Sequence, residues 1–240
     1  MHEVEEINGA LLIDKPAGPT SHDIVDVVRD LYRIKKVGHC GTLDPAATGL
    51  LTLLLGKATK LSEKMMSDDK VYVGSMKLGE TTNTFDAEGE IDETKPVPGL
   101  TLEALQEKAN DFLGDQLQLP PMVSAIKIDG TPLYKLARKG IEVERRKRFI
   151  HLYNFQITEY EPPFAWFKVA CTKGTYVRTL AHDLGQALGC GAHLAGLRRT
   201  VSGKFKVSAA TPLEELTTLS PDDLARCVVP MLQLSAATES

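Results

Sequence analysis

The chain has 240 residues, enough for one large domain or two small ones, and its 42% hydrophobic and 25% charged residues are typical of a globular protein. It has no run of about 18 apolar residues, which excludes a transmembrane helix, and its acidic N-terminus lacks the apolar segment of a secretory signal. We therefore expect a cytoplasmic protein. Four widely spaced cysteines without a CxxC pair predict reduced thiols, and the histidine spacing does not favour a metal site.

The formal net charge of −4 hides a segregation of charge along the chain. Residues 133–151 carry seven Lys/Arg against two Glu, and residues 196–206 carry four Lys/Arg and no acid. Residues 80–111 carry nine acids against two lysines. Such segregation lets a mildly acidic protein present a basic face to nucleic-acid phosphates, although most charge runs are only solvated surfaces. Charge alone leaves both interpretations open.

The N-terminal part predicts a strand and then a helix. Residues 10–16 form an apolar run that ends at a proline, which is typical of a short buried strand. Apolar residues recur with helical spacing in residues 19–34, behind a possible cap at Thr20 or Ser21. The expected core-facing residues of this helix are Ile24, Val27, Val28 and Leu31.

The rest of the chain predicts strands that often follow one another. A glycine-rich loop at 38–49 leads into residues 50–61, which read as a buried strand or a short helix. Further strands are expected at 70–80, after Pro120-Pro121, on both sides of Pro162-Pro163, and at 192–205 with a turn at Ser202-Gly203; residues 81–99 form a loop or irregular hairpin. Helices are expected at 101–114 with a Thr101 cap, at 131–140 and at 175–189 with a Thr175 cap, and one or two short helices are expected near the C-terminus. We predict the α+β class, with a central mixed, largely antiparallel sheet flanked by helices and loops, in a single domain over residues 1–240.

Asp44 raises the main question of the sequence, because it stands in the stretch GHCGTLDPAATG at 38–49. Asp-Pro is a good helix start, since Asp caps a helix and Pro suits its first position. However, Gly38 and Gly41 let the backbone approach a ligand closely, and His39 lies on the same loop. A loop that enters a rigid apolar element is a common mount for a catalytic group. Residue types alone favour the cap.

Six segments, in the same order along the chain, resemble motifs of the TruB family of tRNA pseudouridine synthases. They are LLIDKPAGPTSHDIV, GHCGTLDPAATGLLTLLLGKATK, KVYVGSMKLGETTNTFDAEGE, QLPPMVSAIKIDGTPLYKLARKG, CTKGTYVRTLAHDLG and GAHLAGLRRTVSGKF. The resemblance covers about residues 8–213. It implies the pseudouridine synthase catalytic fold and the conversion of uridine 55 in the tRNA T-loop to pseudouridine.

The resemblance also implies a role for individual residues. Asp44 corresponds to the catalytic nucleophile, Arg178 to the arginine that pairs with it, and Tyr72 to the tyrosine beneath the target base. The positions that correspond to substrate contacts or to support of the catalytic loop are His39, Tyr176, Leu197, Lys15 and Pro16. An ordinary aspartate is ionised at neutral pH without a helper base, so it can act as a covalent nucleophile. Attack at uracil C6, attack at ribose C1′ and a glycal route all stay open.

The implied reaction sets the expected partners. Isomerisation adds and removes no atom, so no cofactor and no metal are expected. The target base lies inside a folded loop and must be flipped out, and the partner is the T-arm of tRNA. We expect a monomer without an obligatory protein partner. Residues 214–240 are interpreted as closing short helices and a polar tail, without the PUA-type domain that many family members append.

Two other classes of function remain as alternatives. One is an RNA-binding protein that helps tRNA to fold, with catalysis secondary or lost; retention of Asp44, Tyr72 and Arg178 argues against it. The other is a hydrolase of glycosidic bonds, which would need a second carboxylate as general acid. Asp86 and Asp183 are available, but no sequence feature marks either one for that role.

Overall fold

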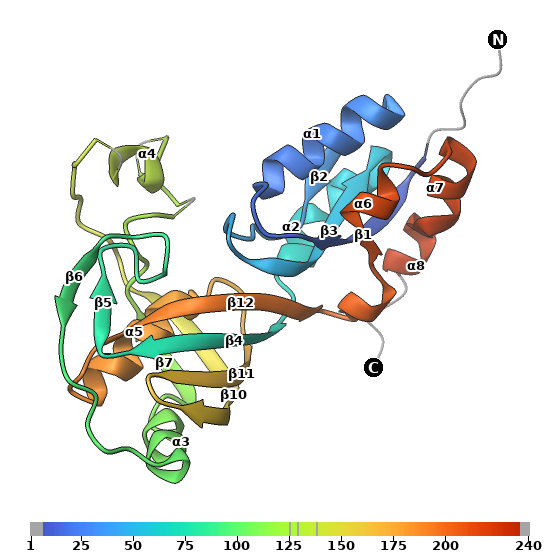
Figure 1. Ribbon diagram of the computed structural model, residues 1–240. Coiled ribbons are helices and arrows are strands. Elements are labelled where there is room, and N and C mark those ends of the chain that lie inside the picture. The colour runs from blue at the N-terminus through green and yellow to red at the C-terminus, as the bar shows by residue number, and fades with distance from the viewer. Residues whose placement is uncertain (1–6, 125, 129, 138, 236–240) are drawn as a thin grey trace. The chain divides into compact units, whose positions relative to one another are not determined.

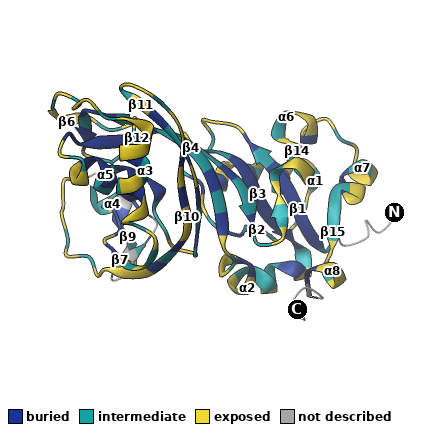
Figure 2. Cartoon of the chain, turned by 90° about the horizontal axis from the view of Figure 1, so that it is seen from below, coloured by how far each residue is buried: buried dark blue, intermediate teal, exposed yellow. Residues whose placement is uncertain are grey.

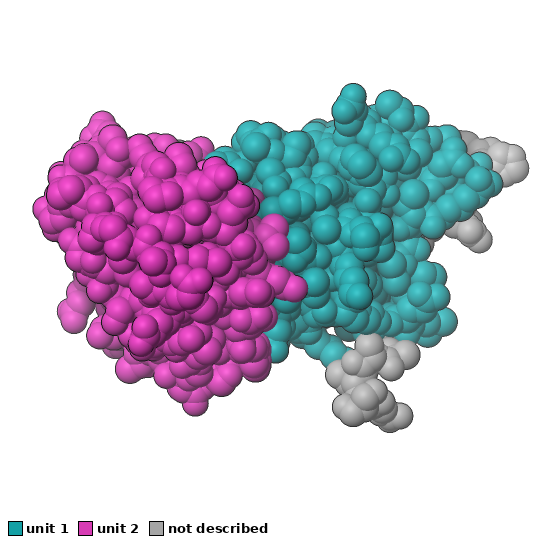
Figure 3. Space-filling model, turned by 60° about the horizontal axis from the view of Figure 1, so that its bottom comes forward, with its two compact units in different colours: residues 1–71, 198–240 teal, residues 72–197 magenta. Residues whose placement is uncertain are grey.

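The structure, a computed structural model, describes residues 7–124, 126–128, 130–137 and 139–235 (Figure 1). The chain divides into two compact units, residues 1–71 with 198–240 and residues 72–197, which Figure 3 colours separately. Strands β4 (Lys70–Leu78) and β12 (Ala192–Ser202) cross this division, so each contributes residues to both units. No helix in the described ranges is long and apolar enough to cross a membrane.

The first unit contains a sheet with the strand order β14-β1-β3-β12. Besides β12 and the first residues of β4, the strands of this unit are β1 (Gly9–Lys15), β2 (Val37–His39), β3 (Thr48–Leu55), β13 (Phe205–Lys206), β14 (Thr211–Pro212) and β15 (Val228–Pro230). Its helices are α1 (Ser21–Tyr32), α2 (Ser62–Met66), α6 (Leu213–Leu216), α7 (Pro221–Cys227) and α8 (Met231–Ser235), with 3₁₀ turns η1 (Gly56–Leu61) and η2 (Val207–Ala209). β1 pairs antiparallel with β3, and β3 pairs parallel with β12, as the mixed sheet predicted from the sequence requires.

Helix α1 begins where the sequence predicts, but it buries a different face. Thr20 is the N-cap and forms a capping box with Asp23. Ser21 and Val25 are buried together with Ile24 and Val28. The predicted core positions Val27 and Leu31 are instead 36% and 48% exposed, because the helix packs through the stripe that contains Ser21. The serine side chain therefore points into the unit rather than capping the helix.

The second unit contains the strand order β12-β4-β11-β10-β7. Its strands besides β4 and β12 are β5 (Glu80–Thr82), β6 (Ile91–Thr94), β7 (Gly114–Gln118), β8 (Lys127–Ile128), β9 (Thr131–Pro132), β10 (Arg148–Glu161) and β11 (Phe164–Cys171). Its helices are α3 (Leu102–Asn110), α4 (Leu133–Ala137) and α5 (Val177–Ala187). The long pair β10 and β11 and the pair β10 and β7 are antiparallel. In both units the strands carry most of the buried residues, which Figure 2 shows in dark blue.

Two predicted helix ends in the second unit were wrong. The helix predicted to reach Gly114 stops at Asn110, because Gly114, at φ +84°, opens β7 and pairs with Leu152. The predicted Thr175 cap of α5 is replaced by Tyr176, which makes no side-chain capping bond. The Thr175 hydroxyl donates instead to the Thr172 carbonyl at 2.9 Å. Residues 81–99 were predicted as a loop or an irregular hairpin, and the hairpin is correct, because β5 and β6 pair with a register shift.

Candidate functional site

Asp44 lies in a tight turn between β2 and β3, not at a helix start. The Ala47 N–H donates to the Asp44 carbonyl at 3.1 Å, which closes a turn around Pro45. The chain then enters β3 directly, because residues 49–55 pair with β1 over its full length. The helix-cap interpretation of Asp44 is therefore wrong, and residues 50–55 are strand rather than helix.

The buried side chain of Lys15 holds this turn through hydrogen bonds. It is fully buried at the end of β1, and its ammonium nitrogen donates to the carbonyls of Pro16 at 2.9 Å, Pro45 at 3.0 Å and Ala47 at 2.7 Å. An ammonium group has three donors and no acceptor, so it suits a cluster of carbonyl oxygens. Lys15 thus ties the end of β1 to Pro45 and Ala47, which follow Asp44 in the turn.

Ser21 fixes the residue before Asp44. Its hydroxyl donates to the Leu43 carbonyl at 3.1 Å and accepts from the Leu43 N–H at 2.9 Å, and all of these atoms are buried. The Gly18 N–H adds a bond to the Pro45 carbonyl at 2.9 Å. A hydroxyl can donate and accept at once, so one small side chain satisfies both polar groups of Leu43. No sequence feature indicated this role, because Ser21 was predicted only as a possible helix cap.

Arg199 holds the two ends of the same loop. Its side chain is 1% exposed, and it donates to carbonyl oxygens through Nε to Leu50 at 2.7 Å, Nη2 to Gly41 at 3.1 Å and Nη1 to Thr42 at 3.5 Å. The sequence placed Arg199 in a basic run and so suggested an RNA-facing side chain. The buried position was missed, because charge alone does not show which face of a strand a residue occupies.

His39, the last residue of β2, and the following Cys40 lie in buried surroundings that shift their pKa values. Burial lowers the pKa of His39 below its ordinary value, and the nearby Arg199 adds to the shift. Its Nδ1 is buried and has no hydrogen-bond partner among the described residues. Burial raises the pKa of the Cys40 thiol to about 11, so the thiol stays protonated and is not a nucleophile. Cys40 packs in an apolar cluster with Ala10, Leu54, Ala58, Met65 and Leu234.

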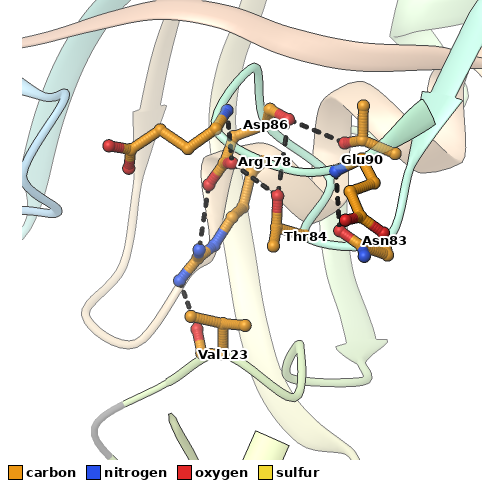
Figure 4. A network of polar contacts seen from close by, with 8 residues as sticks. Asn83, Thr84, Asp86, Glu90, Val123 and Arg178 are labelled. Atoms are coloured by element: carbon orange, nitrogen blue, oxygen red, sulfur yellow. Dashed lines mark hydrogen bonds and ion pairs between the residues drawn. The ribbon is translucent and has the colours of Figure 1, made fainter. Parts of the chain in front are cut away.

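A second polar cluster, in the other unit, is built around Arg178 (Figure 4). Arg178 is buried in the first turn of α5; its Nη1 pairs with Asp86 Oδ2 at 3.1 Å and its Nη2 donates to the Val123 carbonyl at 2.6 Å. Asp86 Oδ1 accepts from the Thr84 hydroxyl at 2.6 Å and from the Glu88 N–H at 3.1 Å. Asp86 therefore ties Arg178 to the segment from Thr84 to Glu88.

The segment that carries Asp86 is held in an unusual backbone conformation. Phe85 has φ 66°, which is uncommon for a residue with a side chain. Its carbonyl accepts from Leu194 N–H at 2.9 Å, and Ala87 N–H donates to the Leu194 carbonyl at 3.0 Å. The Phe85 ring stacks on His182 with centroids 3.9 Å apart. Strand β12 and helix α5 therefore both hold the Asp86 segment where Arg178 meets it.

Three further predicted site residues lie in the second unit. Tyr176 is held by the Gln118 amide, which accepts from its N–H at 2.8 Å and donates to its carbonyl at 3.1 Å, and the Arg178 guanidinium lies 5.9 Å from its ring centre. Tyr72 and Leu197 stand on the neighbouring strands β4 and β12. These strands approach closely at Gly74, where an added Cβ would lie 2.6 Å from the Gly196 carbonyl oxygen.

The predicted site residues thus fall into two groups. Lys15, Pro16, His39 and Asp44 belong to the first unit, where the Lys15 ammonium joins the Pro16 carbonyl to the Asp44 turn. The second unit contains Tyr72, Tyr176, Arg178 and Leu197. Sequence reasoning missed the partners that hold them, which are Ser21, Asp86, Gln118 and Arg199.

Comparison with protein families gives two matches that together span most of the chain. Residues 29–177 match the model of the TruB family pseudouridylate synthase (N terminal domain), and residues 178–234 match that of the tRNA pseudouridylate synthase B C-terminal domain. The second match extends past residue 213, where the motif resemblance ended.

Similar curated proteins carry the same description. The chain is 51% identical over 229 residues to tRNA pseudouridine synthase B of Opitutus terrae, covering 95% of both chains. It is 49% identical over 228 residues to tRNA pseudouridine synthase B of Stutzerimonas stutzeri, covering 95% of this chain and 74% of the other.

Solved structures with a similar fold come from larger proteins. A chain from a Cbf5-Nop10-Gar1 complex matches 96% of this chain with a TM-score of 0.73 and 30% identity. A chain from an H/ACA RNP bound to a substrate RNA containing 2′-deoxyuridine matches 93% with a TM-score of 0.69 and 27% identity. The present chain spans 63% and 59% of the lengths of those two chains, and the likeness agrees with the predicted fold class.

Proposed function

The chain belongs to the TruB family of pseudouridylate synthases, and from this we propose that it isomerises uridine 55 in the T-loop of tRNA to pseudouridine. The observation that carries the proposal is its 51% identity, over 95% of both chains, to a protein named tRNA pseudouridine synthase B. The enzyme is then an isomerase, with tRNA as its substrate.

Asp44 is the proposed nucleophile, and the rigidity of its loop supports this role. A nucleophile gains most when it is held in reacting geometry before the substrate arrives. Each carbonyl from Gly41 to Pro45 accepts a hydrogen bond, and the donors include the side chains of Lys15, Ser21 and Arg199. A residue that only begins a helix needs no such support.

The remaining proposed roles follow the chemistry of the isomerisation. The C1′–N1 bond breaks, the uracil turns, and C1′ joins C5; C5 gives up a proton and N1 takes one up. Arg178 keeps the nucleophile ionised, Tyr72 stacks on the base and takes the C5 proton, and Leu197 forms an apolar wall. His39 and Tyr176 contact the RNA around the flipped uridine. Lys15 and Pro16 support the loop of Asp44.

The substrate determines the expected partners and setting. The basic run at 133–151 and the exposed Lys204 and Lys206 of the run at 196–206 supply cations for tRNA phosphates. We place the enzyme in the cytoplasm, as a monomer that needs no protein partner and no cofactor, with a single catalytic domain.

A tRNA-folding protein without catalysis is the competing function, and one experiment separates the two. Unmodified tRNA is incubated with the protein, and pseudouridine is mapped chemically along the whole strand. We expect conversion at position 55 alone, and no conversion in a tRNA with cytidine at that position. Binding without any new pseudouridine would reject the isomerase and favour the folding protein. Conversion at other positions instead would reject the proposed substrate.

A further inference from the structure

We propose that Arg199 is a positioning residue for the isomerisation: its guanidinium sets the conformation of residues 41–50 and thereby the place of the Asp44 carboxylate. The inference rests on the proposed function, in which Asp44 is the nucleophile. Arg199 contacts neither the substrate nor the reacting atoms in this account, because it acts through the backbone of the loop.

The buried position of Arg199 would destabilise the fold if its side chain served only to fill space. Its side chain is 1% exposed, and within the described ranges it makes no ion pair with a carboxylate. A buried charge without a counter-charge destabilises a fold unless hydrogen bonds replace its water. All three of its nitrogens donate to carbonyls of residues 41–50, so its hydrogen bonds hold the loop. An apolar side chain of similar size would pack there without that cost.

The three carbonyls lie on both sides of Asp44 in the chain. Gly41 and Thr42 precede it, and Leu50 follows it on the first part of β3. One rigid group therefore fixes the distance between the two ends of the loop. Lys15 and Ser21 bind the carbonyls between those ends, at Pro45, Ala47 and Leu43, and so complete the support.

Only an arginine has the shape for this task. Its guanidinium is planar and presents donors in a fixed fork, whereas lysine offers one nitrogen on a flexible stem. Nε and Nη2 reach the carbonyls of Leu50 and Gly41 at 2.7 Å and 3.1 Å. A lysine nitrogen can occupy one of these places at a time, so the substitution keeps the charge and loses the spacing.

Strand β12 delivers the side chain through a close parallel pairing with β3. Arg199 pairs with Gly49, whose φ of +97° favours glycine. An added Cβ at Gly49 would lie 2.3 Å from the Arg199 carbonyl oxygen, so a larger residue would push the strands apart. The preceding residue, Arg198, forms a two-point ion pair with Asp14 at 2.6 Å and 2.9 Å and is partly exposed. Arg199 alone of the two reaches the loop carbonyls.

The test compares Arg199→Lys and Arg199→Ala with wild type, using single-turnover conversion of unmodified tRNA by saturating enzyme and a separate measurement of tRNA affinity. Misplacement of a reacting group by about 1 Å costs about 100-fold in rate. We therefore expect both variants to lose about 100-fold in rate, with Kd for tRNA changed less than about threefold. Low-millimolar guanidinium should restore at least about tenfold of the rate to Arg199→Ala, and nothing to Asp44→Asn. If Arg199→Ala does not fold, Arg199→Lys carries the same comparison.

Two controls separate positioning from general destabilisation and from failure of the proposed function. Leu216→Ala creates a cavity at a fully buried position of α6 in the same unit, and should lower the melting temperature while keeping the wild-type rate below it. Wild-type rates in the Arg199 variants, or rate losses that only follow weaker tRNA binding, would overturn the inference while leaving the isomerase intact. Inactive wild-type protein would overturn both.

Discussion

The ion pair between Asp86 and Arg178 predicts that Asp86→Asn slows isomerisation without weakening tRNA binding. The side chain of Arg178 is 4% exposed and that of Asp86 is 13% exposed, so little water reaches the pair to replace the lost carboxylate. An asparagine keeps one oxygen for the Thr84 hydroxyl and the Glu88 N–H, but it removes the negative charge that faces Arg178 Nη1 at 3.1 Å. Arg178 would then shift from the position in which Asp86 and Val123 hold it.

The size of the effect follows from the type of bond. A hydrogen bond to a charged group contributes about 1.5–3 kcal/mol, and each 1.36 kcal/mol is a factor of ten in rate. If the whole contribution is lost in the transition state, the single-turnover rate falls about 10-fold to 150-fold. Loss from the folded state alone would instead appear as a lower free energy of unfolding with an unchanged rate.

A double-mutant cycle with Asp86→Asn, Arg178→Met and the double variant measures the coupling directly. We expect the double variant to be scarcely slower than Arg178→Met, with a coupling energy of at least about 1.5 kcal/mol. Asp111→Asn is the matched control, because it breaks an exposed ion pair with Lys108 and should leave the rate unchanged. Additive effects, or a wild-type rate in Asp86→Asn, would refute the positioning of Arg178 by Asp86.

Three further predictions follow from the loop and from the charge pattern. Ser21→Ala removes both hydrogen bonds at Leu43 and should lower the free energy of unfolding by about 1–3 kcal/mol in urea titrations, whereas Ser67→Ala, at an exposed hydroxyl, should change it little; equal effects would contradict the role of Ser21. Because burial lowers the pKa of His39, the unfolded chain binds more protons than the folded chain as pH falls below about 6.5. The free energy of unfolding should therefore drop more between pH 7.5 and 5.5 in wild type than in His39→Gln. Parallel plots of that free energy against pH would argue against this. Affinity for tRNA should fall steeply between 50 and 200 mM salt, by about 10³-fold if six phosphates are neutralised, and salt-independent binding would remove the role of the basic runs at 133–151 and 196–206.

The elements with strong periodicity were predictable, and their orientation was not. Apolar runs and helical spacing predicted β1 and α1 within one or two residues. The same spacing is compatible with two neighbouring faces of α1, and the buried face includes Ser21 rather than Leu31. Local hydrophobicity cannot favour a serine in a core, because the reason for its burial is a hydrogen bond to a loop 22 residues away.

Asp44 shows why a local sequence signal can predict the wrong local structure. Asp-Pro suits both the first turn of a helix and a β-turn, since proline has the same φ in both. The pairing of β3 with β1 decides for the turn, and that pairing joins residues far apart in the sequence. The role proposed for Asp44 rests on its motif, whereas its conformation depends on a distant strand.

The supporting residues of the candidate site were the least predictable part. Arg198 and Arg199 are adjacent members of one basic run, yet successive residues of a strand point to opposite faces. Arg198 is partly exposed beside Asp14, and Arg199 is buried against the loop of Asp44. Asp86 lies in an acidic stretch that looked like solvated surface, and only the fold brings it to Arg178, 92 residues away.

Whether Asp44 is the nucleophile is decided by single-turnover conversion of unmodified tRNA by Asp44→Asn, beside wild type and the exposed control Asp222→Asn. We predict that wild type and Asp222→Asn convert uridine 55 at the same rate. Asp44→Asn should form no detectable pseudouridine while still binding tRNA. Conversion by Asp44→Asn at a rate comparable to wild type would contradict the assignment of Asp44 as the nucleophile.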